Sequence, residues 1–175
     1  MKITTLIAAV AIAVAFNPGE IVEEIKVPIL PAIVQVQEET LTYDAFAQSN
    51  IDADGFDAML EGTPLEGYGH AFAEIEEEYG VNGLFALSVC NLESSLGKYC
   101  ANTNNFFGFT ASYGFMSFDT PEAGIRYFGK LISSDWYAGK TIDQIAKIYC
   151  PPNPKWASDV RWLMEYNFKK GGFTV

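Results

Sequence analysis

The residue best placed for chemistry is Glu93, in the last turn of a predicted helix that opens at Asn82. The body of this helix, from Leu84 to Cys90, is apolar nearly all round, and such a helix belongs in the middle of a domain. Burial and the negative end of a helix both disfavour an ionised carboxylate, so we expect a raised pKa for Glu93. A carboxylic acid that stays protonated near neutral pH can donate to the departing oxygen of a glycosidic bond. The alternative is a glutamate that reaches solvent at the helix end.

A loop rich in asparagine and aromatic residues follows Glu93. It contains Asn104-Asn105-Phe106-Phe107-Gly108-Phe109, and Tyr113 comes shortly after. Aromatic faces stack on sugar rings, and asparagine amides both donate to and accept from hydroxyl and acetamido groups. We therefore expect Asn104, Asn105 and Tyr113 to contact a ligand, and Phe107 and Phe109 to lie partly in the core beneath the loop.

The composition indicates one folded domain with extensions. The 175 residues are 49% hydrophobic and 14% aromatic, which is enough for a packed core. The formal net charge is -11, and an acidic chain repels polyphosphates, so we expect no nucleic-acid partner. The same charge argues against simple electrostatic adhesion to anionic surfaces.

The N-terminus has the pattern of an export signal. Lys2 precedes an uncharged run from Ile3 to Ala15, whose end offers the small residues that a signal peptidase requires. The run is shorter than the ~20 residues that span a bilayer, so we expect no stable membrane span. Residues 1–15 are thus predicted to be a signal peptide, with an uncleaved anchor or a buried helix as the alternative.

The rest of the chain divides into an extension and a domain. Residues 16–59 are predicted to be a linker or N-terminal extension, because prolines interrupt much of this stretch. Residues 60–170 are predicted to be the catalytic domain, which is mostly helical with one short β-hairpin between residues 112 and 118. Helix-start signals stand at Thr63-Pro64, Asn82, Thr120-Pro121, Thr141 and Asn153-Pro154. Most of the glutamates between residues 74 and 78 are expected on a solvent-exposed face.

Little in the sequence favours a metal or a cofactor. Cys90, Cys100 and Cys150 allow at most one internal disulfide, and unpaired cysteines would be equally ordinary. No C-x-x-C spacing exists and His70, the single histidine, falls outside the apolar stripe of its helix. We expect no metal site and no cofactor, and we expect His70 to be an exposed bystander.

Three motifs in this order resemble the glucosaminidase domain of glycoside hydrolase family 73, a family that includes bacterial autolysins and phage lysins. They are Val81-Asn82-Gly83-Leu84-Phe85, Leu92-Glu93-Ser94-Ser95-Leu96-Gly97 and Asn104-Asn105-Phe106-Phe107-Gly108-Phe109. The stretch from Leu60 to Gly67 and the later Tyr149-Cys150-Pro151-Pro152 with Trp156 also look like this family. The resemblance implies a lysozyme-like α+β fold and cleavage of the β-1,4 bond after N-acetylglucosamine in peptidoglycan.

The resemblance also implies roles for single residues. It makes Glu93 the general acid, places Tyr149 in the cleft near the acetamido group of the cleaved sugar, and suggests Phe107 and Trp156 as substrate contacts. Many relatives carry a second carboxylate on a longer hairpin, but no acidic residue lies between Phe107 and Phe118 here. Asp119 is the nearest candidate, although it has the place of a helix-start residue.

The missing carboxylate leaves the mechanism open between retaining, inverting and substrate-assisted routes. We favour the last, in which the acetamido oxygen of the substrate is the nucleophile. Two other readings remain: a lytic transglycosylase or muramidase that uses the same acid, and a non-catalytic glycan-binding or virion structural module. For an enzyme we expect a monomer that acts on a peptidoglycan strand and is secreted or associated with the cell wall, of bacterial or phage origin.

Overall fold

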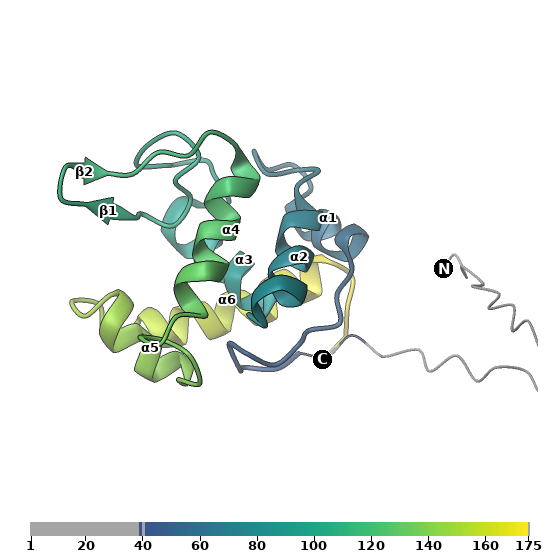
Figure 1. Cartoon of the computed structure of the whole chain (residues 1–175). Helices are drawn as coiled ribbons and strands as arrows, with labels where there is room; N and C mark the ends of the chain where they lie inside the picture. Colours follow the sequence, from purple (N-terminus) through teal and green to yellow (C-terminus); the bar gives the residue numbers. More distant parts are fainter. Residues whose placement is uncertain (1–38, 40, 175) are drawn as a thin grey trace, which may run out of the picture. The chain divides into compact units, whose positions relative to one another are not determined.

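The computed structural model describes residue 39 and residues 41–174, and these form a mostly helical domain with one two-stranded sheet (Figure 1). The expectation of an α+β, mostly helical fold is confirmed. The predicted signal peptide and most of the predicted linker lie outside the described residues. None of the described helices is long and apolar enough to cross a membrane. The elements are α1 (Ala53–Leu60), α2 (Gly69–Tyr79), α3 (Gly83–Ser94), β1 (Thr110–Ala111), β2 (Gly114–Phe115), α4 (Pro121–Ile132), α5 (Ile142–Tyr149) and α6 (Trp156–Lys170).

Helix α3 is the central element of the described domain. Every residue from Gly83 to Cys90 is buried, and the helix packs against α2, α4 and α6. Its first turn is capped by Asn82, whose side-chain oxygen accepts a hydrogen bond from the Phe85 amide at 2.8 Å. The burial of the whole body of α3 matches its uniformly apolar sequence. Because α2, α4 and α6 all pack against α3, its position in the domain is fixed from several sides.

The packed domain starts earlier in the chain than residue 60. Ala45, Ile51, Phe56 and Met59 are all fully or nearly fully buried in the same core as α3. The segment that contains them includes α1, which packs against α2 and α6. The later part of the predicted extension is therefore an integral part of the domain.

Helix α2 begins at Gly69, six residues after the predicted start at Thr63. A Cβ atom at Gly69 would lie 2.3 Å from the carbonyl oxygen of Ala53, so the close crossing with α1 requires glycine here. Thr63 instead organises a turn, in which its hydroxyl donates to the Leu60 carbonyl at 2.7 Å. The predicted end of α2 is confirmed, because Gly80 caps it in the left-handed conformation at φ 63°.

One glutamate of α2 departs from the expected solvent-exposed position. Glu76 is 7% exposed, and its carboxylate accepts hydrogen bonds from the amide of Gly83 at 2.6 Å and from the amide of Ser49 at 3.2 Å. A carboxylate at the start of α3 is stabilised by the amides and the positive end of that helix. Glu76 thereby ties α2, α3 and the chain before α1 together.

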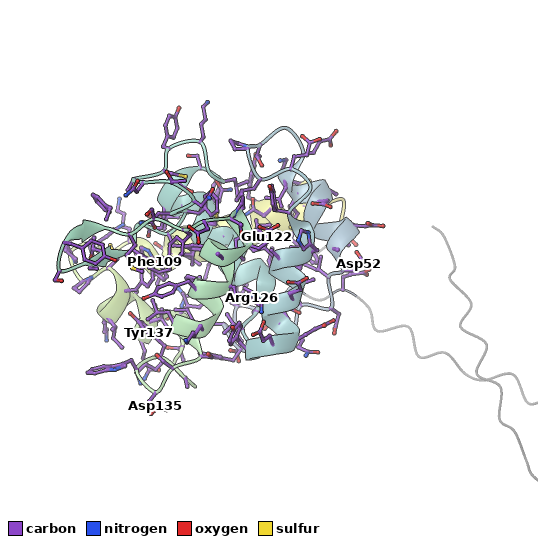
Figure 2. All side chains as sticks on the ribbon, turned by 45° about the horizontal axis from the view of Figure 1, so that its top comes forward. Asp52, Phe109, Glu122, Arg126, Asp135 and Tyr137 are labelled. Carbon is purple, nitrogen blue, oxygen red and sulfur yellow. The ribbon has the colours of Figure 1, made fainter. Side chains whose placement is uncertain are left out.

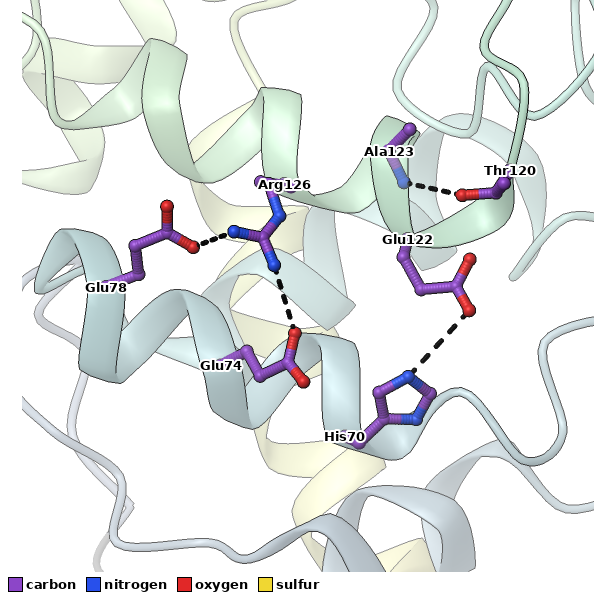
Figure 3. Close-up of polar contacts among 7 residues, drawn as sticks. All are labelled: His70, Glu74, Glu78, Thr120, Glu122, Ala123 and Arg126. Carbon is purple, nitrogen blue, oxygen red and sulfur yellow. Dashed lines mark hydrogen bonds and ion pairs between the residues drawn. The ribbon is translucent and has the colours of Figure 1, made fainter.

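The outer face between α2 and α4 carries ion pairs (Figure 3). Arg126 of α4 contacts both Glu74 and Glu78 of α2. His70 lies 3.9 Å from Glu122 in the first turn of α4, and 44% of its side chain is exposed. Exposed pairs of this kind contribute little to stability. They line the side of α4 that faces α2.

The two strands form the predicted hairpin, beginning two residues earlier than expected. Thr110 pairs with Phe115 and Ala111 with Gly114 in an antiparallel register. Helix α6 also differs slightly from the prediction, because Asn153 and Pro154 form a turn in front of it and the helix opens at Trp156.

Candidate active site

Glu93 lies in the last turn of α3, as predicted. Ser94 closes the helix, and Ser95, Leu96 and Gly97 all have positive φ values, of 52°, 55° and 91°. The hydroxyl of Ser94 donates to the Cys90 carbonyl at 3.0 Å and accepts from the Gly97 amide at 3.1 Å. The chain therefore turns away directly after Glu93, and the local sequence fixes where the carboxyl group stands.

Glu93 faces a hollow of about 350 Å³. The hollow is bounded by the end of α3, the loop before β1, α4 with the turn after it, and the end of α5. Figure 2 shows two of its residues, Phe109 and Tyr137, on the side of the domain away from Asp52. Its lining residues are Glu93, Phe107, Gly108, Phe109, Thr110, Leu131, Tyr137, Tyr149 and Cys150.

The pKa of Glu93 is raised above its ordinary value of 4.5, because the carboxyl group is largely removed from water. The indole N–H of Trp156 opposes this effect by donating to Glu93 Oε1 at 2.9 Å. By contrast, hydrogen bonds lower the pKa values of Glu122 and Glu165. Glu93 therefore combines a raised pKa with a position in a hollow.

Tyr149 lies beside Glu93 at the end of α5. Its hydroxyl donates to the Phe107 carbonyl at 2.8 Å, which links α5 to the loop before β1. Burial, and to a smaller degree the charge of Glu93, raise the pKa of Tyr149 well above 10. The hydroxyl thus stays protonated, and its oxygen can still accept one hydrogen bond from a ligand.

The structure corrects the expected role of Asn105 as a ligand contact. Asn105 is 1% exposed, and its amide nitrogen donates to the carbonyls of Phe109 at 2.8 Å and Met116 at 2.9 Å. Its amide oxygen accepts from the Phe109 amide at 2.9 Å. The side chain is therefore occupied in holding the loop and the hairpin together, and it does not line the hollow.

Two further expected ligand contacts do not line the hollow. Asn104, at φ 52°, donates to the Phe118 carbonyl at 2.9 Å and borders a separate hollow beside Tyr68. Trp156 is 1% exposed and contacts Glu93 rather than open space. Both residues were expected to touch substrate in the hollow; Asn104 instead holds the loop at its edge, and Trp156 holds the carboxyl group from within the core.

Phe107 and Tyr113 have different surroundings. The Phe107 ring is stacked on Phe128, with centroids 4.4 Å apart, so it is partly a core residue as expected, and it also lines the hollow. Tyr113 is 79% exposed between the two strands and is not among the residues that line the hollow. Its ring remains open to a ligand that extends beyond the hollow.

Asp119 is exposed before α4 and does not border the hollow. Among the described residues that line the hollow, Glu93 is the single carboxylate. In the described part of the chain no group of three or more His, Cys, Asp or Glu side chains is arranged to hold a metal ion, and each of the three cysteines is a free thiol.

Sequence reasoning missed Gly108 and Tyr137 as parts of the site. Gly108 has φ +70°, and a Cβ atom there would lie 3.8 Å from Glu93 Oε2. A glycine inside the Asn-Asn-Phe-Phe-Gly-Phe run is the signal that could have found it. Tyr137 follows α4 in a turn, where the sequence offers no local signal.

A half-buried carboxylic acid at the end of a core helix, facing a hollow walled by aromatic rings, has the features of the proton donor of a lysozyme-like glycoside hydrolase. Comparison with known families agrees with this class. Residues 69–169 match the glucosaminidase family, described as mannosyl-glycoprotein endo-beta-N-acetylglucosaminidase, and the chain belongs to this family. This is the family 73 glucosaminidase domain that the sequence motifs resembled.

Two proteins of Streptococcus pneumoniae, from strains TIGR4 and R6, are each 30% identical to this chain over 158 residues. Both carry the name "Putative endo-beta-N-acetylglucosaminidase". The alignments cover 79% of this chain but 24% and 22% of the two relatives, so the chain spans about a quarter of their length.

Crystal structures of autolysin E from S. aureus share the fold. One superposes with a TM-score of 0.59 at 22% identity, covering 74% of this chain and 72% of that chain. A catalytic mutant of the same protein gives a TM-score of 0.59 at 20% identity, covering 78% of this chain and 75% of that chain.

Proposed function

We propose that this chain is a peptidoglycan hydrolase that cleaves the β-1,4 bond after N-acetylglucosamine, with Glu93 as the general acid. The observation that carries the proposal is the partly desolvated Glu93 carboxyl group, held by Trp156 and facing a hollow with aromatic walls. Family membership supports the reaction class. The structures of S. aureus autolysin E hold a muropeptide in one case and an NAG-NAM disaccharide in another, which supports the substrate class.

In the first step the protonated Glu93 donates to the glycosidic oxygen. The bond between this oxygen and the anomeric carbon breaks, and the oxygen keeps the electron pair and leaves as an alcohol. The acetamido carbonyl oxygen of N-acetylglucosamine attacks the anomeric carbon and forms a cyclic oxazolinium ion. This route is favoured because Glu93 is the single carboxylate among the described residues that line the hollow.

Tyr149 is suited to stabilise the cyclic ion. Its proton is directed to the Phe107 carbonyl, so its oxygen can accept the N–H of the acetamido group. This N–H becomes more acidic as positive charge develops on the ring, and the hydrogen bond strengthens accordingly.

In the second step the Glu93 carboxylate removes a proton from a water molecule, which attacks the anomeric carbon. The ring reopens to the acetamide, and Glu93 regains its proton. Two displacements at one carbon leave the anomeric configuration retained.

The products test the proposed function directly. We expect mass spectrometry of digested peptidoglycan to show new reducing ends on N-acetylglucosamine, and NMR of fresh digests to show the β-anomer first. Anhydromuramic products would instead identify a lytic transglycosylase, and reducing N-acetylmuramic acid would identify a muramidase. Formation of the α-anomer would contradict the substrate-assisted route while leaving the bond specificity intact.

The raised pKa of Glu93 predicts the pH dependence. The acid acts in its protonated form, so kcat/KM should fall as the pH rises through the pKa of Glu93. Because burial raises this pKa, the fall should occur above pH 4.5, the ordinary value for a glutamic acid. A pH profile of kcat/KM with soluble glycan fragments measures it, and a fall centred at or below pH 4.5 would contradict the assignment.

We also propose that the protein works outside the cell or at the cell wall, and that residues 1–15 direct export. The proposal rests on the export-signal pattern and on the nature of the substrate.

The described hollow would bind only a short part of the glycan strand, and the exposed Tyr113 offers a further ring on which a sugar could stack.

A further inference from the structure

Trp156 is the direct neighbour of Glu93 inside the protein. It is the first residue of α6, 1% exposed, and its indole N–H donates to Glu93 Oε1 at 2.9 Å. The indole packs against the rings of Tyr149 and Phe85, with centroids 5.3 Å and 6.4 Å away. A ring held on two sides in this way cannot turn its N–H away from the carboxyl group without repacking the core.

The chemistry of the indole determines which oxygen of Glu93 carries the proton. An indole nitrogen donates a hydrogen bond and cannot accept one. Glu93 Oε1 therefore accepts in both protonation states, and because the carbonyl oxygen of a neutral acid is a better acceptor than its hydroxyl oxygen, the proton is favoured on Oε2. The Oε2 atom lies on the side of Gly108, where a Cβ atom would be 3.8 Å from it, and Gly108 lines the hollow.

We propose that Trp156 is a positioning residue that reserves Glu93 Oε1 as an acceptor and thereby presents the transferable proton on Oε2 toward the substrate. The inference rests on the proposed role of Glu93 as the general acid. When the Oε2–H bond breaks and its proton joins the glycosidic oxygen, the negative charge left on Glu93 is shared by both oxygens. The indole N–H then donates to an anion, which is a stronger hydrogen bond than one to a neutral acid.

Gly108 fits this arrangement. Its φ of +70° is a conformation that side-chain-bearing residues rarely adopt, and it brings the loop backbone past Oε2 without a side chain in between. The buried Phe107 on one side and Phe109 on the other keep the loop in place through their stacked rings. The proton-bearing oxygen is thus left facing the hollow.

The sharpest test removes the N–H alone. Benzothienylalanine in place of Trp156 keeps the shape of the ring system and substitutes sulfur for the N–H group. Losing a hydrogen bond to a charged group should lower kcat by about 10- to 100-fold, with a smaller change in KM. The fall of kcat/KM with pH should move to higher pH, because the ionised form of Glu93 loses its donor. An unchanged kcat and pH profile would overturn the proposal.

The same replacement at Trp162 is the matched control. Trp162 lies on α6 as well, but it is 64% exposed and stacks on Tyr166, so kcat and the pH profile should not change. Equal effects at both positions would show that the analogue acts through α6 as a whole, and would contradict a specific role of the Trp156 N–H.

A measurement on the unaltered protein separates this inference from the proposed function. Trp136 and Trp162 are exposed and Trp156 is buried, so three indole signals are expected in a ¹⁵N–¹H spectrum, one of them protected from solvent exchange. The protected signal should titrate with pH in the wild type and stay constant in Glu93→Gln. A protected signal that does not titrate would overturn the Trp156 inference even if Glu93→Gln is inactive. If Glu93→Gln is fully active, the proposed function fails, whatever the indole signal does.

Discussion

Replacement of Glu93 by glutamine is expected to lower kcat/KM on peptidoglycan by about 10²- to 10⁴-fold, the range that general acid catalysis contributes. The amide has nearly the same shape but no acidic proton for the glycosidic oxygen. Its oxygen can still accept from the Trp156 indole, and an uncharged amide avoids the cost of burying an ionised carboxylate. The melting temperature should therefore stay the same or rise while activity is lost. Clearing of cell-wall suspensions and thermal melting measure the two effects.

The exposed Glu77 provides a matched control for this variant. Glu77→Gln makes the same exchange of a carboxyl group for an amide on the surface of α2, away from the hollow, so clearing should proceed at the wild-type rate. Glu93→Gln should still sediment with insoluble peptidoglycan, because the walls of the hollow are intact. If wild type and Glu93→Gln clear walls equally, Glu93 is not the acid. If neither clears walls and both bind them, the chain is a non-catalytic glycan-binding module.

The features predicted correctly from the sequence are those fixed within a few residues. Asn82, Thr120 and Thr141 each cap a helix with a side-chain oxygen that accepts from the amide three residues on, and the sequence shows both partners. The burial of the body of α3 could likewise be predicted from its consecutive apolar residues. Because Glu93 follows that body directly, its place at the end of a buried helix, and hence its raised pKa, could be inferred.

The features that could not be predicted from the sequence depend on contacts with distant parts of the chain. Glu76 has the spacing of an exposed residue, but the amides of Ser49 and Gly83 approach it from two other segments. Helix α2 starts at Gly69, where α1 passes too close for a side chain, while the local pattern favours Thr63. Tertiary contacts of this kind override local signals, and one sequence does not reveal them.

Trp156 is a residue of the site whose tertiary contacts also could not be predicted from the sequence. Trp156 was expected to contact substrate, but its ring packs against Tyr149 and Phe85, and these partners are visible only in the fold. The indole nevertheless contacts Glu93, the proposed general acid. The sequence identified a residue that matters to the site and assigned it the wrong kind of contact.

Replacement of Asn105 by alanine is expected to destabilise the domain by about 3 kcal/mol or more, because each buried polar group left without a partner costs about 1–3 kcal/mol. Three backbone groups lose their partner: the Phe109 carbonyl, the Phe109 amide and the Met116 carbonyl. The melting temperature should fall by roughly 10 °C, and activity should fall with it, because Phe109 belongs to the wall of the hollow. Thermal melting with and without glycan fragments measures the loss.

Asn102 separates a structural role of Asn105 from a direct contact with substrate. It lies in the same loop and donates to the Phe115 carbonyl, but it is exposed, so water can replace its hydrogen bonds and Asn102→Ala should melt within a few degrees of the wild type. If Asn105→Ala keeps the wild-type melting temperature and raises KM alone, Asn105 contacts the sugar and its buried hydrogen bonds are not what holds the loop. The predicted result is the reverse, since an amide with both its oxygen and its nitrogen bonded inside the protein has little left to offer a ligand.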